Sequence, residues 1–372
     1  MTDDVILEAR AIAKHFTSGG GLLQTRRVVR AVDGISLAVK RGETLSIVGE
    51  SGCGKSTLAR LLVRLLTLTS GEVLYNGEDI SDLSNAQMRR LRKDLQFVFQ
   101  DPFSSLNPRM TVGAIIEEPL KVHTDLPRAE RRQKVAELLA KVGLRADFAN
   151  RYPHEFSGGQ RQRIGIARAL ASGPKVIIGD EPVSALDVSV QAQVINLLED
   201  LKREFDLTLV LIAHDLAVIR HMSDRVAVMY LGEVVELATT DLLFDAPLHP
   251  YTQALMQAIP IPSPRSRTVR TELTGDAPSP LAPPSGCRFH TRCPHADALC
   301  AAEKPILNDA GDGRQVACHH WQDIAARVQH QSGEPPRTPT AEARFALYQD
   351  RSQKKHGDTK TGPRSADQPQ EL

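Results

Sequence analysis

The sequence has no excess of charge of either sign. Its 46 lysines and arginines nearly balance its 45 aspartates and glutamates, so no global basic field indicates a nucleic-acid partner. It also lacks a long apolar run, because no stretch approaches the ~20 residues of a membrane-spanning helix. The N-terminus MTDDVILEAR lacks the basic and apolar regions of a signal peptide. We therefore expect a folded protein that stays in the cytosol and does not cross a bilayer alone.

Cysteine is scarce and unevenly placed. One of the five cysteines, Cys53, precedes residue 287, and the other four follow in the spacing C-x5-C-x6-C-x17-C. In a reducing compartment, clustered cysteines indicate metal ligands rather than disulfides. These four residues are Cys287, Cys293, Cys300 and Cys318.

The order of apolar runs predicts an α/β fold with a parallel sheet at its core. Short β-rich runs at 5–12, 35–40 and 43–49 predict an N-terminal antiparallel β lobe, and Asn76-Gly77 predicts a type I′ hairpin turn. From about residue 85 to 172 the pattern is mainly helical and charged, which predicts a helical subdomain insertion. Later runs alternate with helical segments, as βαβ units do. These runs are KVIIGD (175–180), LTLVLIAH (207–214) and RVAVMY (225–230).

The C-terminal third changes in character. Proline-rich stretches at 259–267 and 277–286 predict an irregular extension, and the polar residues beyond about 330 predict a disordered tail. We expect a nucleotide-binding domain at 1–255, a metal-binding extension at 256–325 and the tail at 326–372.

The segment GESGCGKS (49–56) matches the phosphate-loop pattern G-x4-G-K-[ST] between a predicted strand and a predicted helix. Glycine permits the backbone angles that aim amides at phosphate oxygens. Lys55 is expected to bridge the β- and γ-phosphates of ATP, and the Ser56 hydroxyl to ligate Mg²⁺. The nucleotide-binding residues predicted here are Gly49, Glu50, Ser51, Gly52, Cys53, Gly54, Lys55, Ser56 and Thr57.

Two acids follow the apolar strand of KVIIGDEP (175–182). Asp180 is predicted to hold Mg²⁺, directly or through water. Glu181 is predicted to polarise the attacking water as a general base. Together with the phosphate loop, these acids predict ATP hydrolysis.

The segment FSGGQRQRIGIARAL (156–170) resembles the signature motif of the ATP-binding cassette family, and the other family elements follow in the expected order. Gln100 of VFQDP is similar to the Q-loop glutamine, which implies a third Mg²⁺ ligand. His214 of LIAHDL resembles the catalytic switch histidine, and Phe16 the aromatic residue that stacks on adenine. The signature residues that the resemblance places against ATP are Ser157, Gly158, Gly159 and Gln160.

One set of motifs per chain implies a dimer. The resemblance places the signature motif of one cassette against the phosphate loop of another, which is either a second copy or a similar subunit. ATP closes the pair and hydrolysis releases it.

Several longer segments, among them HPYTQAL and the cysteine segment, resemble the ATPase subunits of bacterial oligopeptide and dipeptide importers, and most closely the F-type subunit of dipeptide permeases. This resemblance implies a D-type partner cassette, two membrane permease subunits, a peptide-binding protein and a peripheral position at the cytoplasmic side of the inner membrane. Closely similar ATPases serve nickel, glutathione and antimicrobial-peptide importers. A soluble cassette ATPase acting on nucleic acid or ribosomes is a rival interpretation, and a metal or redox sensor in the C-terminal region is a third.

The four late cysteines are expected to bind one metal centre, a [4Fe–4S] cluster rather than zinc. Zinc sites usually contain close C-x2-4-C pairs, which this spacing lacks, and importer ATPases of this type include some with such a cluster. Zinc and plain reduced cysteines stay open as alternatives. We expect a structural role, because the predicted ATP site is complete without the cluster. Four nearby histidines are expected to be surface residues: His290, His295, His319 and His320.

Overall fold

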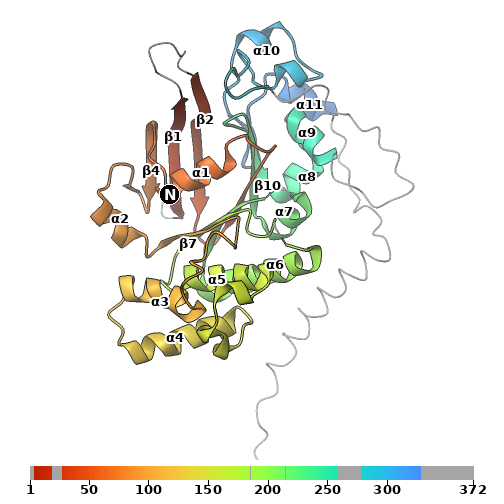
Figure 1. Cartoon of the computed structure of the whole chain (residues 1–372). Coiled ribbons are helices and arrows are strands. Elements are labelled where there is room, and N and C mark those ends of the chain that lie inside the picture. The colour runs from red at the N-terminus through yellow and green to blue at the C-terminus, as the bar shows by residue number, and fades with distance from the viewer. Residues whose placement is uncertain (1–3, 19–26, 185, 214, 258–277, 328–372) are drawn as a thin grey trace, which may run out of the picture.

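The computed structural model describes residues 4–18, 27–184, 186–213, 215–257 and 278–327. Two sheets form its frame (Figure 1). The smaller sheet is antiparallel, has the strand order β2-β1-β4-β5 and forms the predicted N-terminal lobe. Its strands are β1 (Val5–Ser18), β2 (Arg27–Lys40), β4 (Ser70–Tyr75) and β5 (Glu78–Asp79).

The larger sheet has eight strands in the order β11-β12-β10-β9-β3-β8-β7-β6. The five strands from β9 to β6 are parallel, as the βαβ pattern predicts, and the remaining three continue the sheet in antiparallel pairing. The strands are β3 (Thr44–Val48), β6 (Leu95–Val98), β7 (Val176–Asp180), β8 (Thr208–Ile212), β9 (Arg225–Tyr230), β10 (Glu233–Thr239), β11 (Asn308–Gly311) and β12 (Arg314–Val316).

The helices pack around this sheet, and α3 to α6 gather in one layer below it in the view of Figure 1. The α-helices are α1 (Lys55–Leu62), α2 (Asn85–Leu91), α3 (Val112–His123), α4 (Arg128–Lys141), α5 (Gly158–Leu170), α6 (Val188–Phe205), α7 (Leu216–Met222), α8 (Thr240–Asp245), α9 (Pro250–Gln257), α10 (Ala298–Ala302) and α11 (Trp321–Arg327). Three short 3-10 helices are η1 (Ala146–Asn150), η2 (Pro153–Glu155) and η3 (His290–Arg292). Within the described residues, no helix combines the length and apolar character that crossing a bilayer requires.

The hairpin between β4 and β5 has the predicted turn. Asn76 and Gly77 have φ values of 51° and 81°, and a type I′ turn requires positive φ at both central positions. Tyr75 pairs with Glu78 across the turn. The short-range prediction is therefore confirmed in detail.

Two strands lie where the sequence pattern indicates something else. The run at 43–49 was assigned to the N-terminal lobe, but β3 lies in the middle of the large sheet between β8 and β9. Each residue of β3 is buried, as expected for a strand covered on both faces. Strand β6 forms the edge of the same sheet, although it falls within the segment of mainly helical pattern.

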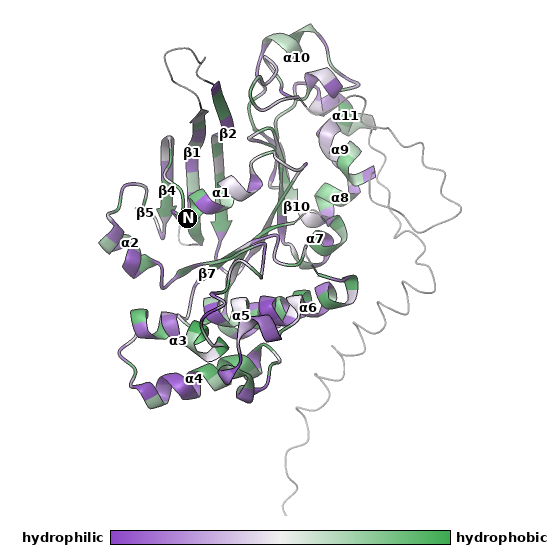
Figure 2. Cartoon of the chain, in the orientation of Figure 1, coloured by the Kyte–Doolittle hydropathy of each residue, from purple (hydrophilic) through white to green (hydrophobic). Residues whose placement is uncertain are grey.

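Two large apolar clusters hold these layers together. One lies between the N-terminal strands, α1 and the central sheet. The other lies between the central sheet and the layer of α3 to α6. Figure 2 shows hydrophobic strands around β7 and β10, whereas α2 and α4 carry hydrophilic stretches. In α4 the buried residues Val135, Leu138 and Leu139 recur at helical spacing on one face.

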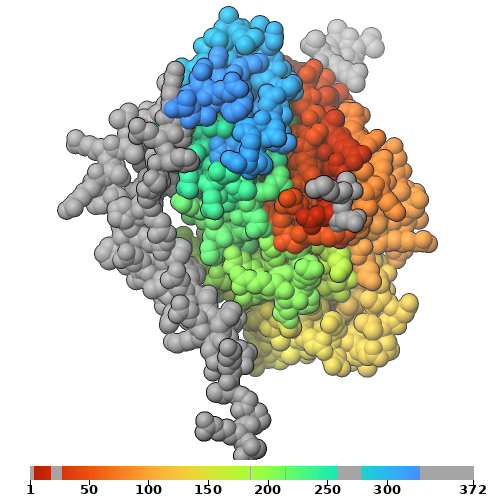
Figure 3. Space-filling model, turned by 180° about the vertical axis from the view of Figure 1, so that it is seen from behind, coloured from red at the N-terminus to blue at the C-terminus, as the bar shows by residue number. Residues whose placement is uncertain are grey.

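The C-terminal extension is joined to the nucleotide-binding part. Strand β12 pairs with β10 through Glu236–Val316 and Leu237–Gln315, so the β11–β12 hairpin continues the large sheet. The irregular extension that the proline content predicts therefore contains two strands that the pattern does not reveal. Figure 3 shows residues 278–327 (blue) directly beside the N-terminal strands (red). The stretch at 258–277 and nearly all of the predicted tail lie outside the described residues.

Candidate active site

The predicted phosphate loop connects the buried end of β3 to the start of α1. Gly49 and Gly54 have φ values of 149° and 108°. A Cβ atom at Gly49 would lie 2.2 Å from the carbonyl oxygen of Met229, and one at Gly54 would lie 2.0 Å from that of Ala31. Glycine is therefore required at both positions by backbone angle and by space.

Lys55 is held inside its own loop. Its side chain is buried, and its Nζ donates to the carbonyl oxygens of Gly49 at 2.8 Å and Glu50 at 2.9 Å. Among the described side chains none caps the N-terminus of α1, whose N-cap residue is Gly54. The loop therefore presents a fixed ammonium group beside an uncapped helix N-terminus, an arrangement that favours an anion.

Ser56 and Asp180 come together at the carboxyl end of β7. The Ser56 Oγ donates a 2.7 Å hydrogen bond to Oδ1 of Asp180, whose side chain is only 1% exposed. Burial raises the pKa of Asp180, and the adjacent Glu181 adds to this. Arg60 lies 3.7 Å from the same carboxylate. A hydroxyl and a carboxylate are the hard oxygen ligands that Mg²⁺ prefers, so this pair fits the predicted ion.

Glu181 follows directly in an unusual backbone conformation. Its φ is 47°, and a left-handed conformation of a non-glycine residue costs about 1–3 kcal/mol. Its amide donates to the carbonyl oxygen of Ile212 at 3.0 Å, which fixes the strained position. The Nε2 atom of Gln100 donates to its Oε2 at 2.7 Å. In this structure Gln100 therefore contacts Glu181 rather than the Ser56–Asp180 pair.

The signature residues lie elsewhere in the chain. Ser157 is the N-cap of α5, and it exchanges capping hydrogen bonds with Gln160. Helix α5 belongs to the lower layer of Figure 1, whereas α1 lies above the sheet. Within the described residues no hydrogen bond or ion pair links Ser157, Gly158, Gly159 or Gln160 to the phosphate loop.

The two remaining predicted residues are Phe16 and His214. Phe16 lies on β1 with 41% of its surface exposed, and Lys14 Nζ lies 5.4 Å from its ring centroid. An exposed ring near a cation is available for stacking. His214 lies outside the described residues.

The cysteine-rich segment places four thiols in one neighbourhood. The amide of Cys287 donates to the carbonyl oxygen of Cys300 at 2.8 Å. Burial, together with the other three thiols, raises the pKa of Cys318 to about 12. All four are free cysteines, and Cys53 is buried separately in the phosphate loop.

The distances between ligating side-chain atoms in this segment limit which metal it could hold. Within the described residues, the one group of three or more ligating side chains with all atoms inside 4.8 Å of one another is Asp297, Cys300 and His320. No three of the four sulfurs are gathered that closely. Zinc with bonds of about 2.3 Å to sulfur would need its thiolates roughly 3.8 Å apart. His320, expected to be a surface residue, is instead partly buried 3.2 Å from Asp297.

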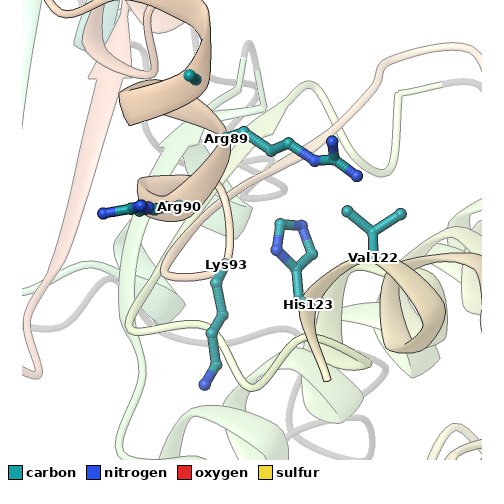
Figure 4. A pocket seen from close by; sticks show the side chains of 6 residues that line it. Arg89, Arg90, Lys93, Val122 and His123 are labelled. Carbon is teal, nitrogen blue, oxygen red and sulfur yellow. The ribbon is translucent and has the colours of Figure 1, made fainter. Parts of the chain in front are cut away.

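A basic pocket of about 420 Å³ lies between α2 and the end of α3. Figure 4 shows Arg89 reaching across it toward Val122 and His123. Burial, with Arg89 and Lys93 nearby, lowers the pKa of His123. The residues that line it are Ala86, Arg89, Arg90, Lys93, Val122 and His123, with no acidic side chain among them.

Several contacts of the phosphate loop come from residues that sequence reasoning missed. Tyr251 accepts a 2.8 Å hydrogen bond from the amide of Glu50, and Arg292 pairs with the Glu50 carboxylate at 3.1 Å. These partners are 201 and 242 residues away. Tyr251 lies within HPYTQAL and Arg292 precedes Cys293, so both belong to quoted segments whose role no local pattern indicates.

The chain matches two protein families over separate parts of its length. Residues 32–184 match the family described as ABC transporter. Residues 235–300 match the family described as oligopeptide/dipeptide transporter, C-terminal region. The second match includes most of β10 and three of the four late cysteines.

Curated relatives match over most of the sequence. The oligopeptide transport ATP-binding protein AppF of Bacillus subtilis (strain 168) is 56% identical over 321 residues, which are 85% of this chain and 97% of that protein. The oligopeptide transport ATP-binding protein OppF of Escherichia coli (strain K12) is 54% identical over 310 residues, 82% of this chain and 92% of that protein. The dipeptide transport ATP-binding protein DppF of Haemophilus influenzae (strain ATCC 51907 / DSM 11121 / KW20 / Rd) is 49% identical over 325 residues, 86% of this chain and 99% of that protein.

A solved structure supports the same fold. The dimeric post-hydrolysis state of the ATP-binding cassette MJ0796, bound to ADP and Pi, is 33% identical and has a TM-score of 0.57. The match covers 63% of this chain and 99% of the MJ0796 chain.

Proposed function

The chain belongs to the family of oligopeptide and dipeptide transport ATP-binding proteins, and from this premise we propose how its residues bind and hydrolyse ATP for peptide import. It is the ATPase subunit of an importer of oligopeptides or dipeptides. The observation that carries the mechanism is the convergence of the loop lysine, Ser56, Asp180 and Glu181 where β3 and β7 end. The match of residues 235–300 to the transporter C-terminal family favours this role over a soluble cassette ATPase.

ATP binds with its phosphates in the loop and its adenine against Phe16. The β- and γ-phosphates replace the carbonyl oxygens of Gly49 and Glu50 as partners of the Lys55 ammonium group. The amides of the loop and of the first turn of α1 donate to the phosphate oxygens. Since the loop is already folded around Lys55, little ordering is needed on binding.

Ser56 and Asp180 would hold Mg²⁺. When bound, it neutralises charge on the phosphate oxygens. Asp180 is buried with a raised pKa, and the cation would favour its ionised form. Gln100 would have to release Glu181 to become a third ligand.

Glu181 accepts the proton of the attacking water. Its strained backbone and the Gln100 hydrogen bond fix the direction of the carboxylate. His214 is proposed as the switch residue on the strength of the family resemblance alone.

A complete site requires a second cassette. Because α5 lies in a different layer from the phosphate loop, we assign Ser157, Gly158, Gly159 and Gln160 to the ATP bound by the partner cassette. The neighbouring structure MJ0796 is itself dimeric. The partner proposed here is a D-type paralogue, as the F-type resemblance implies, with a second copy of this chain as the alternative.

The basic pocket between α2 and α3 is proposed as part of the surface that docks onto the two permease subunits, which places the chain at the cytoplasmic side of the inner membrane. Three cationic side chains, Arg89, Arg90 and Lys93, and exposed Val122 suit a segment with one acidic and one apolar residue. Arg89→Glu should reduce uptake, whereas the same change at Arg203, which is 76% exposed on α6, should not.

The four late cysteines are proposed to hold a [4Fe–4S] cluster. Soft thiolates are the ligands that iron–sulfur clusters use, and a cluster spans more space than a single zinc ion. The residues would be Cys287, Cys293, Cys300 and Cys318.

Uptake of a labelled dipeptide and tripeptide by cells lacking the gene tests the proposed function. The unaltered chain should restore uptake, Lys55→Ala should not, and Arg203→Ala should restore it fully. ATP hydrolysis that continues while uptake stays absent with the unaltered chain would favour the non-transport interpretation.

A further inference from the structure

The cysteine-bearing segment contacts the phosphate loop directly. The Nη1 atom of Arg292 lies 3.1 Å from both carboxylate oxygens of Glu50 and 3.3 Å from the hydroxyl of Tyr230. The Arg292 side chain is only 7% exposed. Its Nε atom is buried and has no hydrogen-bond partner among the described residues. The Glu50 side chain is 28% exposed, so the ion pair is half-buried, and holding Arg292 in it still takes one charge out of water at a cost.

Glu50 connects this arginine to Lys55. The carbonyl oxygen of Glu50 accepts a 2.9 Å hydrogen bond from Lys55 Nζ, and its amide donates to Tyr251. Glu50 therefore makes three contacts: its carboxylate pairs with Arg292, its amide donates to the Tyr251 hydroxyl, and its carbonyl oxygen accepts from Lys55. A rotation of the Glu50 backbone would move the carbonyl that holds the lysine.

The segment that carries Arg292 is packed against the cassette through Phe289 and Arg288. Phe289 is 1% exposed and packs against Tyr230, Tyr251 and His249, with ring centroids 5.3, 5.5 and 5.7 Å away. Arg288 pairs with Asp33 and, at 3.0 Å, with Glu233. Arg288 thus fastens the same segment to the cassette without touching the phosphate loop.

We infer that Arg292 is a positioning residue for nucleotide binding: through Glu50 it keeps the phosphate loop in the conformation that receives ATP. The inference rests on ATP as the ligand of this loop, but it needs no metal at the cysteines. Without Arg292 the loop populates other conformations, and the apparent dissociation constant rises by the inverse of the competent fraction. The extension thereby contributes to the ATP site, although the sequence predicts an ATP site that is complete without the cysteine cluster.

Equilibrium binding of a fluorescent ATP analogue to the full chain with Mg²⁺ tests this. Arg292→Gln should raise Kd about tenfold, in the usual range of coupling between sites, and Arg292→Lys should recover part of the loss. Arg288→Gln is the matched control and should lower the melting temperature while leaving Kd within twofold. A Kd within twofold for Arg292→Gln would overturn the inference, as would an equal rise in Kd for Arg288→Gln.

A double-mutant cycle separates positioning from the simple field of a positive charge near ATP. In a Glu50→Gln background, Arg292→Gln should change Kd less than twofold, because its partner is already gone. A full tenfold effect in that background would mean a through-space charge effect and would overturn the inference. If Arg292→Gln fails to fold, Arg292→Lys in both backgrounds gives the same comparison. Failure of the unaltered chain to bind the analogue would instead contradict the proposed function.

Discussion

The side-chain amide of Gln100 donates a 2.7 Å hydrogen bond to the carboxylate of Glu181. Gln100 follows β6 and Glu181 follows β7, which are neighbouring parallel strands. Beyond Gln100 the chain leaves the sheet for the layer of α3 to α5. A shift of this layer against the sheet would therefore reach Glu181, the proposed general base, through one residue, which would give the proposed permease docking a direct route to hydrolysis.

Glu181→Gln should strongly reduce turnover while ATP still binds. The amide keeps the shape of the side chain but cannot accept a proton from water, so kcat should fall about 10²-fold or more. Steady-state phosphate release and a nucleotide-binding titration measure the two effects. Glu130→Gln, exposed in the first turn of α4, is the control and should be unaffected. Near-normal turnover by Glu181→Gln would disprove the assignment.

Ser157→Arg should impair hydrolysis at the partner cassette more than at this chain's own phosphate loop. The reason is that α5 and the phosphate loop of one chain lie in different layers, so Ser157 is assigned to the ATP of the partner cassette. In a heterodimer, the variant is combined with a lysine knockout in either phosphate loop, and phosphate release is measured for each site. Full-rate hydrolysis by a strictly monomeric preparation would contradict the two-cassette arrangement.

Anaerobically purified full chain should be brown and contain about four iron atoms, as a four-cysteine cubane requires. Cys318→Ser should lose most of this iron, because removing one thiolate leaves a ligand position open. Cys53→Ser is the matched control, since that thiol is buried in the phosphate loop, and should keep the iron. One zinc and no iron would overturn the choice of metal, and no metal would overturn the site.

Stability should fall as the pH drops below about 6.5, in part through His249. Burial lowers its pKa to about 3, while the unfolded value is 6.5. Below pH 6.5 the unfolded chain binds a proton that the folded chain refuses, so folding loses about 2 kcal/mol between pH 6.5 and 5. The amide of Tyr251 donates to Nδ1 of His249 at 3.0 Å. In the variant His249→Asn, the asparagine side chain keeps an acceptor for this amide.

His249→Asn should therefore flatten the pH dependence of the urea midpoint by that amount. Burial raises the pKa of the neighbouring Glu236. Its effect on stability is opposite to that of His249, because the folded state binds this proton at a higher pH than the unfolded state does. That contribution is common to both proteins and cancels in the difference. Equal slopes for the two proteins would show that His249 does not contribute.

Local signals were sufficient to locate the phosphate loop between β3 and α1 and the two acids at the end of β7. Gly49, Gly54 and Lys55 are fixed by backbone angle and chain order, and Asp180 is the last residue of the predicted and observed apolar strand β7. The turn at Asn76 needs only two residues for its geometry. Each of these features depends on neighbours in sequence.

The missed features depend on distant partners. The five residues of β3 are buried on both faces, but nothing in TLSIV indicates whether its neighbours are β8 and β9 or the N-terminal strands. The edge strand β6 has only four residues between helical segments. Arg292 next to a cysteine and Tyr251 on a helix carry no local sign that both meet Glu50. Only the folded chain brings them to the phosphate loop.

The β11–β12 hairpin also covers one side of β10, the strand that would otherwise end the large sheet. An uncovered strand edge offers unpaired amides and carbonyls to any other extended chain and is a template for aggregation. Removing everything after α9 would expose that edge in a protein whose cassette motifs are all still present. By pairing with β10, the hairpin leaves the four-residue β11 as the edge in place of the seven-residue β10, and a short edge strand is a poorer template.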